Sequence, residues 1–369
     1  MQKIIIDARI RQSSTGRYID RLIEHLYTID SPYHYIILVA EEDPFISKKD
    51  NFEVVTCPYK PYSFNPLNQI TFAWWLKKLN ADLLHSTLSP LDPVFYLSNM
   101  VTTTHDLTLY KYNRTGQLPA VLNYIRNKGY QFFMWNTHKK AAYVITPTKF
   151  VKDAVASKFN YPKDRIIVTY ESSEPPLVSK AIAPNPKPQK YILYVGNSFE
   201  HKNLERLAQA FQKVKQNVPE LQLVLAGKRD YYSEQLEEWI ANKQISDVLF
   251  PGRVSDEELK WLYQNAEAYV FASLSEGFGL PPLEAMAHDC PVVSSKATCL
   301  PEVYGDAAVY FDPENVEEMA EVILSVLKNK KLQKKLVDNG KKQLKKYSWK
   351  RMAQQTHDVY EKALSKNHI

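Results

Sequence analysis

The sequence predicts an α/β protein made of two doubly wound domains, on the strength of three observations. Short apolar runs alternate with longer amphipathic segments in both halves of the chain. Many of these runs are apolar at successive positions, which is typical of strands in a parallel sheet that helices cover on both faces. The third observation is length, because 369 residues exceed the roughly 250–300 at which one hydrophobic core stops growing.

We predict the first domain over residues 1–171, where apolar runs predict strands separated by helical periods. These runs are Lys3–Asp7, Tyr35–Val39, Phe52–Thr56, Asp82–His85, Met100–His105, Tyr143–Thr146 and Ile166–Tyr170. Residues 172–189 then interrupt the alternation with five prolines and predict a stiff linker.

The alternation restarts in residues 190–345, which predict a second doubly wound domain. Its expected strands are Tyr191–Val195, Leu221–Ala226, Val248–Phe250, Ala268–Ala272, Pro291–Ser294 and Ala307–Phe311. Two such domains are expected to leave a cleft between the carboxyl ends of their strands, where open α/β sheets bind ligands.

Charge and cysteine content exclude little but fit an intracellular protein. The net charge of +6 favours anionic partners without identifying one. Cys57, Cys290 and Cys299 have no C-x-x-C spacing, so neither a zinc site nor a disulfide framework is expected. The first apolar run is too short for a secretory signal, and no run approaches the ~20 residues that span a bilayer. We therefore expect a cytoplasmic protein that is soluble or only peripherally attached to a membrane.

The segment Glu276–Glu284 predicts an anion and sugar site after a strand of the second domain. Its two glycines permit close backbone approach, and Pro281 and Pro282 suit the start of a helix. Free N–H groups at that helix start would hold a diphosphate, while the two carboxylates would accept hydrogen bonds from paired sugar hydroxyls. The alternative is that Glu284 satisfies the helix N-terminus and Glu276 is a surface acid.

Three residues outside this segment are further candidates. Lys202, beside a helix expected to open at Asn203, would add a full positive charge to an anion site, although a lysine in a turn is usually solvated. Gly16 would let the backbone approach a ligand, or be an ordinary loop glycine. His105 is expected at the end of a strand, as a structural residue or as a group facing the cleft.

These segments resemble retaining glycosyltransferases of family 4, whose E-x7-E element is similar to Glu276–Glu284. The other similar segments are Tyr194–Gly196 with Lys202–Leu204, Leu300–Pro313, Tyr347–Trp349, Thr15–Tyr18 and His105–Leu107. The resemblance covers nearly the whole chain and implies the GT-B architecture of two Rossmann-like domains. It also implies that a final helix in residues 346–369 packs back toward the first domain, which would be the acceptor side.

The resemblance implies a role for each matching residue. Glu276, Lys202 and His105 would be catalytic, with Glu276 on the transferred sugar and Lys202 on the diphosphate. Donor binding would involve Gly16, Asn197, Gly277, Phe278, Gly279, Leu280 and the ribose-binding Glu284. Relatives often have arginine where this chain has Asn197 and His201, so Arg229 or Arg253 are candidates for the missing cation. The stretch Ser13–Gly16 also lacks the usual glycine pair.

The resulting hypothesis is a retaining, metal-independent transfer of a hexose from a nucleoside diphosphate sugar to a glycan or lipid-linked acceptor. Mannose from GDP-mannose is the first choice and a UDP-sugar the second, for cell-surface polysaccharide synthesis. No D-x-D motif for a metal is present, no cofactor is expected, and no motif supports nucleic-acid binding. The alternatives are a sugar-nucleotide epimerase or hydrolase and a non-catalytic binding subunit.

The aromatic and basic segment Val121–Lys140 has two interpretations. It could lie on an anionic membrane as an amphipathic helix, or it could be a core helix. A core helix is the preferred interpretation.

Overall fold

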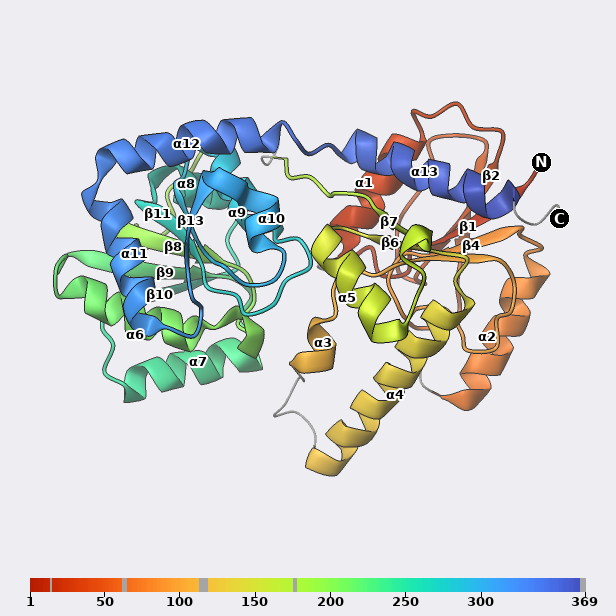
Figure 1. Cartoon of the computed structure of the whole chain (residues 1–369), viewed down its shortest axis with the longest axis horizontal. Coiled ribbons are helices and arrows are strands. Elements are labelled where there is room, and N and C mark those ends of the chain that lie inside the picture. The colour runs from red at the N-terminus through yellow and green to blue at the C-terminus, as the bar shows by residue number, and fades with distance from the viewer. Residues whose placement is uncertain (14, 62–64, 113–118, 175–177, 366–369) are drawn as a thin grey trace. The chain divides into compact units, whose positions relative to one another are not determined.

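A computed structural model describes residues 1–13, 15–61, 65–112, 119–174 and 178–365 (Figure 1). Its internal contacts divide the chain into unit 1, residues 1–171 with 348–369, and unit 2, residues 172–347. Ser14, Pro175 and Pro176, on which parts of the glycine-loop and linker predictions fall, lie outside the described residues. Each unit is described by itself, and the predicted cleft stays a prediction.

The described helices and strands alternate along the chain (Figure 1). Unit 1 contains β1 Lys3–Asp7, α1 Gly16–Leu26, β2 His34–Val39, β3 Phe52–Thr56, α2 Pro66–Lys78, β4 Leu83–Ser86, β5 Met100–Thr103, α3 Thr108–Lys111, α4 Ala120–Lys140, β6 Tyr143–Thr146, α5 Lys149–Phe159, η1 Lys163–Arg165, β7 Ile166–Val168 and α13 Trp349–Ser365. Unit 2 contains β8 Lys190–Val195, η2 Glu200–Lys202, α6 Leu204–Lys215, β9 Leu221–Ala226, α7 Tyr231–Asn242, β10 Val248–Gly252, α8 Asp256–Asn265, β11 Ala268–Phe271, α9 Leu280–Ala287, β12 Val292–Ser295, α10 Leu300–Tyr304, η3 Gly305–Ala307, β13 Ala308–Phe311, α11 Val316–Lys328 and α12 Lys330–Leu344.

The sheet of unit 1 has the strand order β3-β2-β1-β4-β5-β6-β7, with every pairing parallel. Its central strands are buried at almost every position, because helices cover both faces. The doubly wound prediction is therefore confirmed for this unit. Two strands end earlier than predicted, at Thr103 and Val168, so His105 lies in the loop beyond β5 rather than within the strand.

The sheet of unit 2 has the order β10-β9-β8-β11-β12-β13 and is also parallel throughout. The chain runs outward from β8 in one direction and from β11 in the other, so the strand order reverses between these two strands. Loops after the two strands diverge at such a switch point and leave a crevice for ligand. The second predicted doubly wound domain is confirmed, and its switch point locates the candidate site.

The last helix, α13, packs within unit 1 against α1 and against β4, β5 and β6 of the sheet, which confirms that prediction (Figure 1). Its Tyr360 hydroxyl lies 2.6 Å from Nδ1 of His85 on β4, and Nε2 of His85 lies 2.8 Å from the Thr103 hydroxyl. Burial lowers the pKa of His85 to about 3. The ring is therefore neutral, and it joins the end of the chain to the centre of the first sheet.

Helix α4 differs from the preferred sequence interpretation, which made it a core helix. Met134, Thr137 and His138 near its end are buried, but Val121 is 70% exposed and Ile125 60% exposed. The core-helix prediction is wrong for the first half of α4. An apolar sequence does not specify whether other parts of the chain cover its side chains. Among the described residues, no helix is long and apolar enough to cross a bilayer.

The predicted linker has contacts with unit 2 along its described part. The backbone N–H of Ile182 donates to the carbonyl of Glu257, and Nζ of Lys260 donates to the carbonyl of Val178. These bonds tie the segment to α8.

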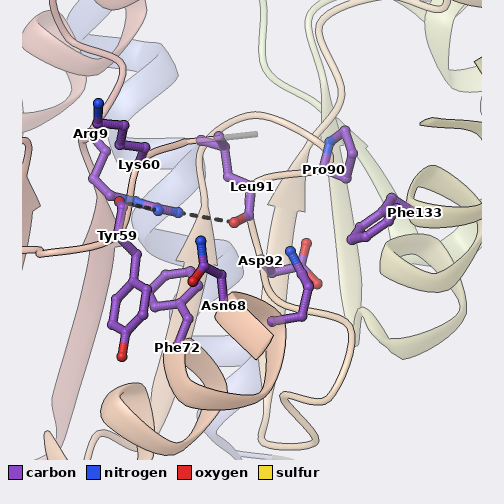
Figure 2. A pocket seen from close by; sticks show the side chains of 10 residues that line it. Arg9, Tyr59, Lys60, Asn68, Phe72, Pro90, Leu91, Asp92 and Phe133 are labelled. Carbon is purple, nitrogen blue, oxygen red and sulfur yellow. Dashed lines mark hydrogen bonds between the residues drawn. The ribbon is translucent and has the colours of Figure 1, made fainter. Parts of the chain in front are cut away.

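A pocket of unit 1 lies beyond the carboxyl ends of β1, β3 and β4 (Figure 2). Its wall is held by Arg9, whose guanidinium pairs with Asp7 at 2.6 Å and donates to the carbonyls of Tyr59 and Leu91. Because these bonds use the Arg9 donors within the protein, Arg9 fixes three segments of the chain at this edge of the sheet.

Replacing Tyr360 by Phe should destabilise unit 1 by about 1–3 kcal/mol, because Nδ1 of the buried His85 would lose its partner. Urea unfolding followed by circular dichroism measures the change. Tyr59→Phe is the matched control, since the Tyr59 ring is half-buried beside Phe72 and keeps its packing. Equal stability of the Tyr360→Phe variant and the wild type would contradict the role given to this bond.

Candidate active site

The candidate site lies at the switch point of unit 2, where the loops after β8 and β11 carry Lys202 and Glu276. Nζ of Lys202 lies 2.6 Å from Oε1 of Glu276, and the two side chains are 14% and 13% exposed. Partial burial removes water from both charges, so each depends on the other for compensation. The structure thus brings together the two charged groups that the sequence singled out from segments 74 residues apart.

The backbone at Glu276 is fixed by the turn before α10. The N–H of Glu276 donates to Oγ1 of Thr298 at 3.1 Å, and the Cys299 thiol donates to the Glu276 carbonyl at 3.3 Å. Burial, and then the charge of Glu276, hold the pKa of Cys299 well above its ordinary value, so the thiol keeps its proton. These bonds orient the Glu276 side chain toward Lys202.

Gly279 ends the loop and precedes helix α9 in a left-handed conformation with φ +85°. A Cβ at this position would lie 2.1 Å from the hydroxyl oxygen of Tyr304, which donates to the Gly279 carbonyl at 2.8 Å. Only glycine meets both requirements. The Phe278 side chain is 4% exposed and packs edge-on against Tyr347, so the prediction that Phe278 lines the sugar can apply only to its backbone.

Helix α9 begins at Leu280, one residue before the proline pair that predicted it. Glu284 lies beyond the first turn of this helix, which contains no acidic residue. Its carboxylate is 7% exposed and accepts a hydrogen bond of 3.1 Å from the Tyr263 hydroxyl. Burial, and then the charge of Glu284, hold the pKa of Tyr263 well above its ordinary value. Tyr263 therefore stays a neutral donor that orients Glu284.

Asn203 is the N-cap residue of helix α6, as the sequence predicted, and its side chain has a further function. Its backbone is left-handed with φ +62°, and its side chain makes no cap to helix α6. Instead, Nδ2 of Asn203 donates to the carbonyls of Ala272 at 3.1 Å and Pro313 at 2.7 Å. It thereby ties the segment with Lys202 to the segment that leads to Glu276.

The predicted cations Arg229 and Arg253 lie beyond β9 and β10. Arg229 lines a second pocket of unit 2, together with Gly196 and Lys228. Its guanidinium is 57% exposed and pairs with Glu237 at 3.0 Å, while Arg253 is exposed beside Gly252. In the neighbouring loop, the Asn197 carbonyl accepts a hydrogen bond of 2.7 Å from the Tyr194 hydroxyl.

In unit 1, His105 is held between two acceptors. Nδ1 lies 3.0 Å from the carboxylate of Glu171, and Nε2 lies 3.0 Å from the Thr87 carbonyl. The two acceptors lie on opposite sides of the ring and fix its orientation. The ring also packs edge-on against Tyr18 of helix α1.

Gly16 is the first residue of α1 rather than part of the preceding loop. A Cβ there would lie 1.6 Å from the carbonyl oxygen of Arg11. The missing side chain therefore accommodates the chain's own backbone, which corrects the expectation that it makes room for a ligand.

Comparison with known proteins decides the family. The model "Glycosyl transferases group 1" matches residues 178–343, and "Glycosyltransferase Family 4" matches residues 15–171. O-antigen chain mannosyltransferase B of Escherichia coli is 30% identical over 78% of this chain and 76% of its own length. The chain belongs to the family 4 glycosyltransferases.

Two further similarities agree with that assignment. The O-antigen chain mannosyltransferase RfbU of Salmonella typhimurium is 28% identical over 86% of this chain and 89% of its own length. The sucrose-phosphate synthase of Thermosynechococcus elongatus superposes with a TM-score of 0.77 at 18% identity, covering 99% of this chain and 100% of that one. At this identity the superposition shows the fold alone, and the fold of this glycosyltransferase is GT-B.

The sequence analysis missed residues that hold the predicted ones, namely Tyr263, Thr298 and Tyr304 in unit 2 and Glu171 in unit 1. Each acts by holding a predicted residue, and each is distant from it in sequence, so no local spacing marks it. One sequence feature pointed to Thr298: it lies just before the segment starting at Leu300 that resembles the family.

Replacing Gly279 by Ala should destabilise unit 2 by at least about 1–3 kcal/mol, because the left-handed backbone and the Tyr304 hydroxyl both oppose a Cβ. Urea unfolding measures this change. The matched control is Gly129→Ala in α4, where a Cβ meets nothing within 4 Å and should stabilise the helix by about 0.5–1 kcal/mol. Adding Tyr304→Phe to Gly279→Ala should restore part of the loss. Unchanged stability on Gly279→Ala alone would contradict the geometry.

Proposed function

We propose that this glycosyltransferase transfers mannose from GDP-mannose to a hydroxyl of a glycan or lipid-linked acceptor, with retention at the anomeric carbon and without a metal. UDP-sugars are the second choice of donor. The observation that carries the proposal is the pair of Lys202 and Glu276 at the switch point of unit 2. Open parallel sheets bind nucleotides at such a point.

The pair suggests how a diphosphate donor is received. A diphosphate brings more negative charge than one carboxylate, so Lys202 should exchange Glu276 for the phosphate oxygens. Lys202 then stabilises charge that develops on the leaving diphosphate. Glu276, released from its ion pair, can accept hydrogen bonds from hydroxyls of the transferred sugar. The lysine and the N-terminus of α9 together supply the positive field that a metal supplies in other transferases.

Glu284 is assigned to the ribose. Its buried carboxylate is an acceptor for a hydroxyl pair, and the Tyr263 hydroxyl orients it by donating to one of its oxygens. Gly277, Gly279 and Leu280 would present backbone to the sugar and phosphates. Asn197, Arg229 and Arg253 stay candidates for the nucleotide, and the pocket beside Arg229 supports Arg229 above the others.

The choice of mannose and of the acceptor rests on the relatives. The names of two of them specify O-antigen chain mannosyltransferases, and that role supports mannose and a cell-surface polysaccharide. We infer that the enzyme works at the cytoplasmic face of a membrane, where lipid-linked glycans are extended. His105, with Glu171, is the candidate group of unit 1 for contacts to sugar hydroxyls.

A sugar-nucleotide epimerase or hydrolase of the same fold is the second candidate. It needs a carboxylate placed as a base, whereas the proposal assigns Glu276 to hydroxyls of the transferred sugar and Glu284 to the ribose. A non-catalytic binding subunit is less supported, because the charged groups of the site are present and paired.

The proposal is tested by transfer from a panel of GDP- and UDP-sugars, combined with thermal shifts by the same ligands. GDP-mannose should support transfer, and GDP should raise the melting temperature more than UDP, because a ligand of the folded state stabilises it. Lys202→Met and Glu276→Gln should each lower kcat by about a hundredfold or more.

The matched control is the exposed pair Lys190–Glu220, where Lys190→Met and Glu220→Gln should leave kcat unchanged. Wild-type kcat in Lys202→Met and Glu276→Gln would refute the site. Sugar release or an epimer without acceptor transfer would favour the second candidate.

A further inference from the structure

Exposed apolar side chains gather on one part of unit 1. Of the seventeen large apolar side chains that are exposed among the described residues, eleven lie on α2, on residues 95–97 and on α4. We call these the apolar face: Leu67, Ile70, Trp74, Phe95, Leu97, Val121, Leu122, Tyr124, Ile125, Phe132 and Trp135. Among the described residues, unit 2 exposes two, Ile182 and Tyr231. Patches of this kind mark interaction sites.

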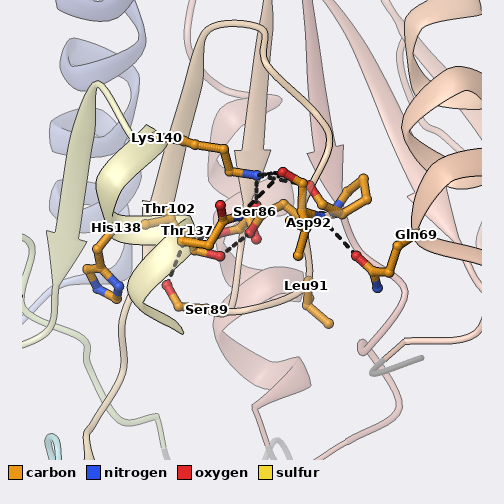
Figure 3. A network of polar contacts seen from close by, with 12 residues as sticks. Gln69, Ser86, Ser89, Leu91, Asp92, Thr102, Thr137, His138 and Lys140 are labelled. Atoms are coloured by element: carbon orange, nitrogen blue, oxygen red, sulfur yellow. Dashed lines mark hydrogen bonds and ion pairs between the residues drawn. The ribbon is translucent and has the colours of Figure 1, made fainter. Parts of the chain in front are cut away.

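The three segments are neighbours, because the loop after β4 is bonded both to α2 and to the C-terminal part of α4 (Figure 3). Oε1 of Gln69 on α2 accepts the Val94 N–H at 2.8 Å, and Nδ2 of Asn136 on α4 donates to the Val94 carbonyl at 3.4 Å. Nζ of Lys140 pairs with Asp92 at 2.8 Å and donates to the Pro93 carbonyl at 2.9 Å. Side chains between Val94 and Asn99 are therefore presented beside those of α2 and α4.

The exposed residues follow helical spacing, so each helix presents a continuous face. On α4, Val121, Ile125, Phe132 and Trp135 recur every three to four residues or a multiple of that interval. On α2, Leu67, Ile70 and Trp74 are exposed while Phe72, Ala73 and Leu76 are buried. Each helix thus has one apolar side in the core of unit 1 and a second apolar side in solvent.

The charges on this surface have one sign. Neither α2 nor α4 contains Asp or Glu, whereas together they carry five lysines and one arginine. Asp92 between them is buried and paired with Lys140. The surface is therefore apolar and cationic together.

Three lysines stand over exposed aromatic rings, each four residues further along its helix. Nζ of Lys78 lies 3.5 Å from the Trp74 ring centroid, Nζ of Lys128 lies 5.5 Å from that of Tyr124, and Nζ of Lys139 lies 4.9 Å from that of Trp135. Tryptophan and tyrosine favour the headgroup level of a bilayer, and lysine can extend from there to the phosphates.

We propose that the apolar face docks unit 1 on an anionic phospholipid membrane, with α2 and α4 lying in the interface. The apolar residues enter the acyl boundary while the lysines meet anionic headgroups. A second copy of the chain is a poorer occupant, because it would bring a second set of cations and no acids. Membrane docking itself does not depend on the proposed function. Only its consequence does, which is that docking would bring a lipid-linked acceptor within reach of the enzyme.

The test is co-sedimentation of the full chain with vesicles of equal parts phosphatidylglycerol and phosphatidylcholine. The wild type should bind these vesicles at low salt, bind pure phosphatidylcholine at least about tenfold more weakly, and lose most binding at ~1 M salt, where charges are screened beyond about 3 Å. The variant Trp74→Ala with Trp135→Ala should lower the partition coefficient at least about tenfold, since aromatic anchors supply large contact area.

Two control variants separate this surface from general effects. Ile182→Ala with Tyr231→Ala removes the exposed apolar side chains of unit 2, and Lys334→Glu with Lys335→Glu reverses charge on the lysine-rich helix α12. Both should bind anionic vesicles like the wild type. Absence of wild-type binding at low salt, or equal losses in the controls, would overturn the proposal. A dimer at low salt that the double tryptophan variant abolishes, without vesicle binding, would identify a second copy as the occupant.

The same samples separate this inference from the proposed function. The double tryptophan variant should keep the wild-type thermal shift with GDP, because unit 2 is unchanged. Vesicle binding without any nucleotide shift would leave the apolar face standing and refute the donor assignment. A nucleotide-induced thermal shift without vesicle binding would leave the donor assignment standing and refute the membrane-docking proposal.

Discussion

The ion pair between Lys202 and Glu276 is the interaction on which the donor site depends. It lies where the strand order of the second sheet reverses, so it joins the two loops that a parallel sheet leaves open to a ligand. Without ligand, each partly buried charge is compensated by the other. In the proposed function, a diphosphate sugar would offer a new partner to both, an anion for the lysine and hydroxyls for the carboxylate. The same contact can therefore stabilise the empty site and be exchanged on binding.

The loops that carry these charges are held by bonds that do not take part in chemistry. Asn203 bridges two carbonyls, Thr298 accepts from the Glu276 backbone, and Tyr304 fills the space that a side chain at Gly279 would need. Tyr263 similarly orients Glu284. Such supporting contacts keep the charged groups within the small tolerance that transfer requires. The charged side chains of the site can therefore exchange partners while the backbone that carries them is held in place.

The sequence predicted the features that local patterns encode, and missed those that distant contacts create. Alternating apolar runs located the strand ends to within about two residues, and the Gly-Pro-rich segment located the loop before α9. The partner of His105 is 66 residues away and that of Glu284 is 21, so no spacing rule identifies them. Gly16 was assigned to a ligand although it accommodates the Arg11 carbonyl. Helix α4 has a core-like composition, and composition does not specify which side remains uncovered.

The fold, the carboxylates of Glu276 and Glu284, and Lys202 support one stereochemical outcome above others. In that outcome the acceptor hydroxyl attacks the sugar from the same face that the diphosphate leaves. In the proposed exchange Glu276 accepts hydrogen bonds from hydroxyls of the transferred sugar and Glu284 from the ribose, so neither glutamate is assigned as a base on the opposite face. The direct measurement is NMR of the first product formed from GDP-mannose and an acceptor glycan. The account predicts the α-mannoside, the same configuration as in the donor, and a β-mannoside as the first product would contradict it.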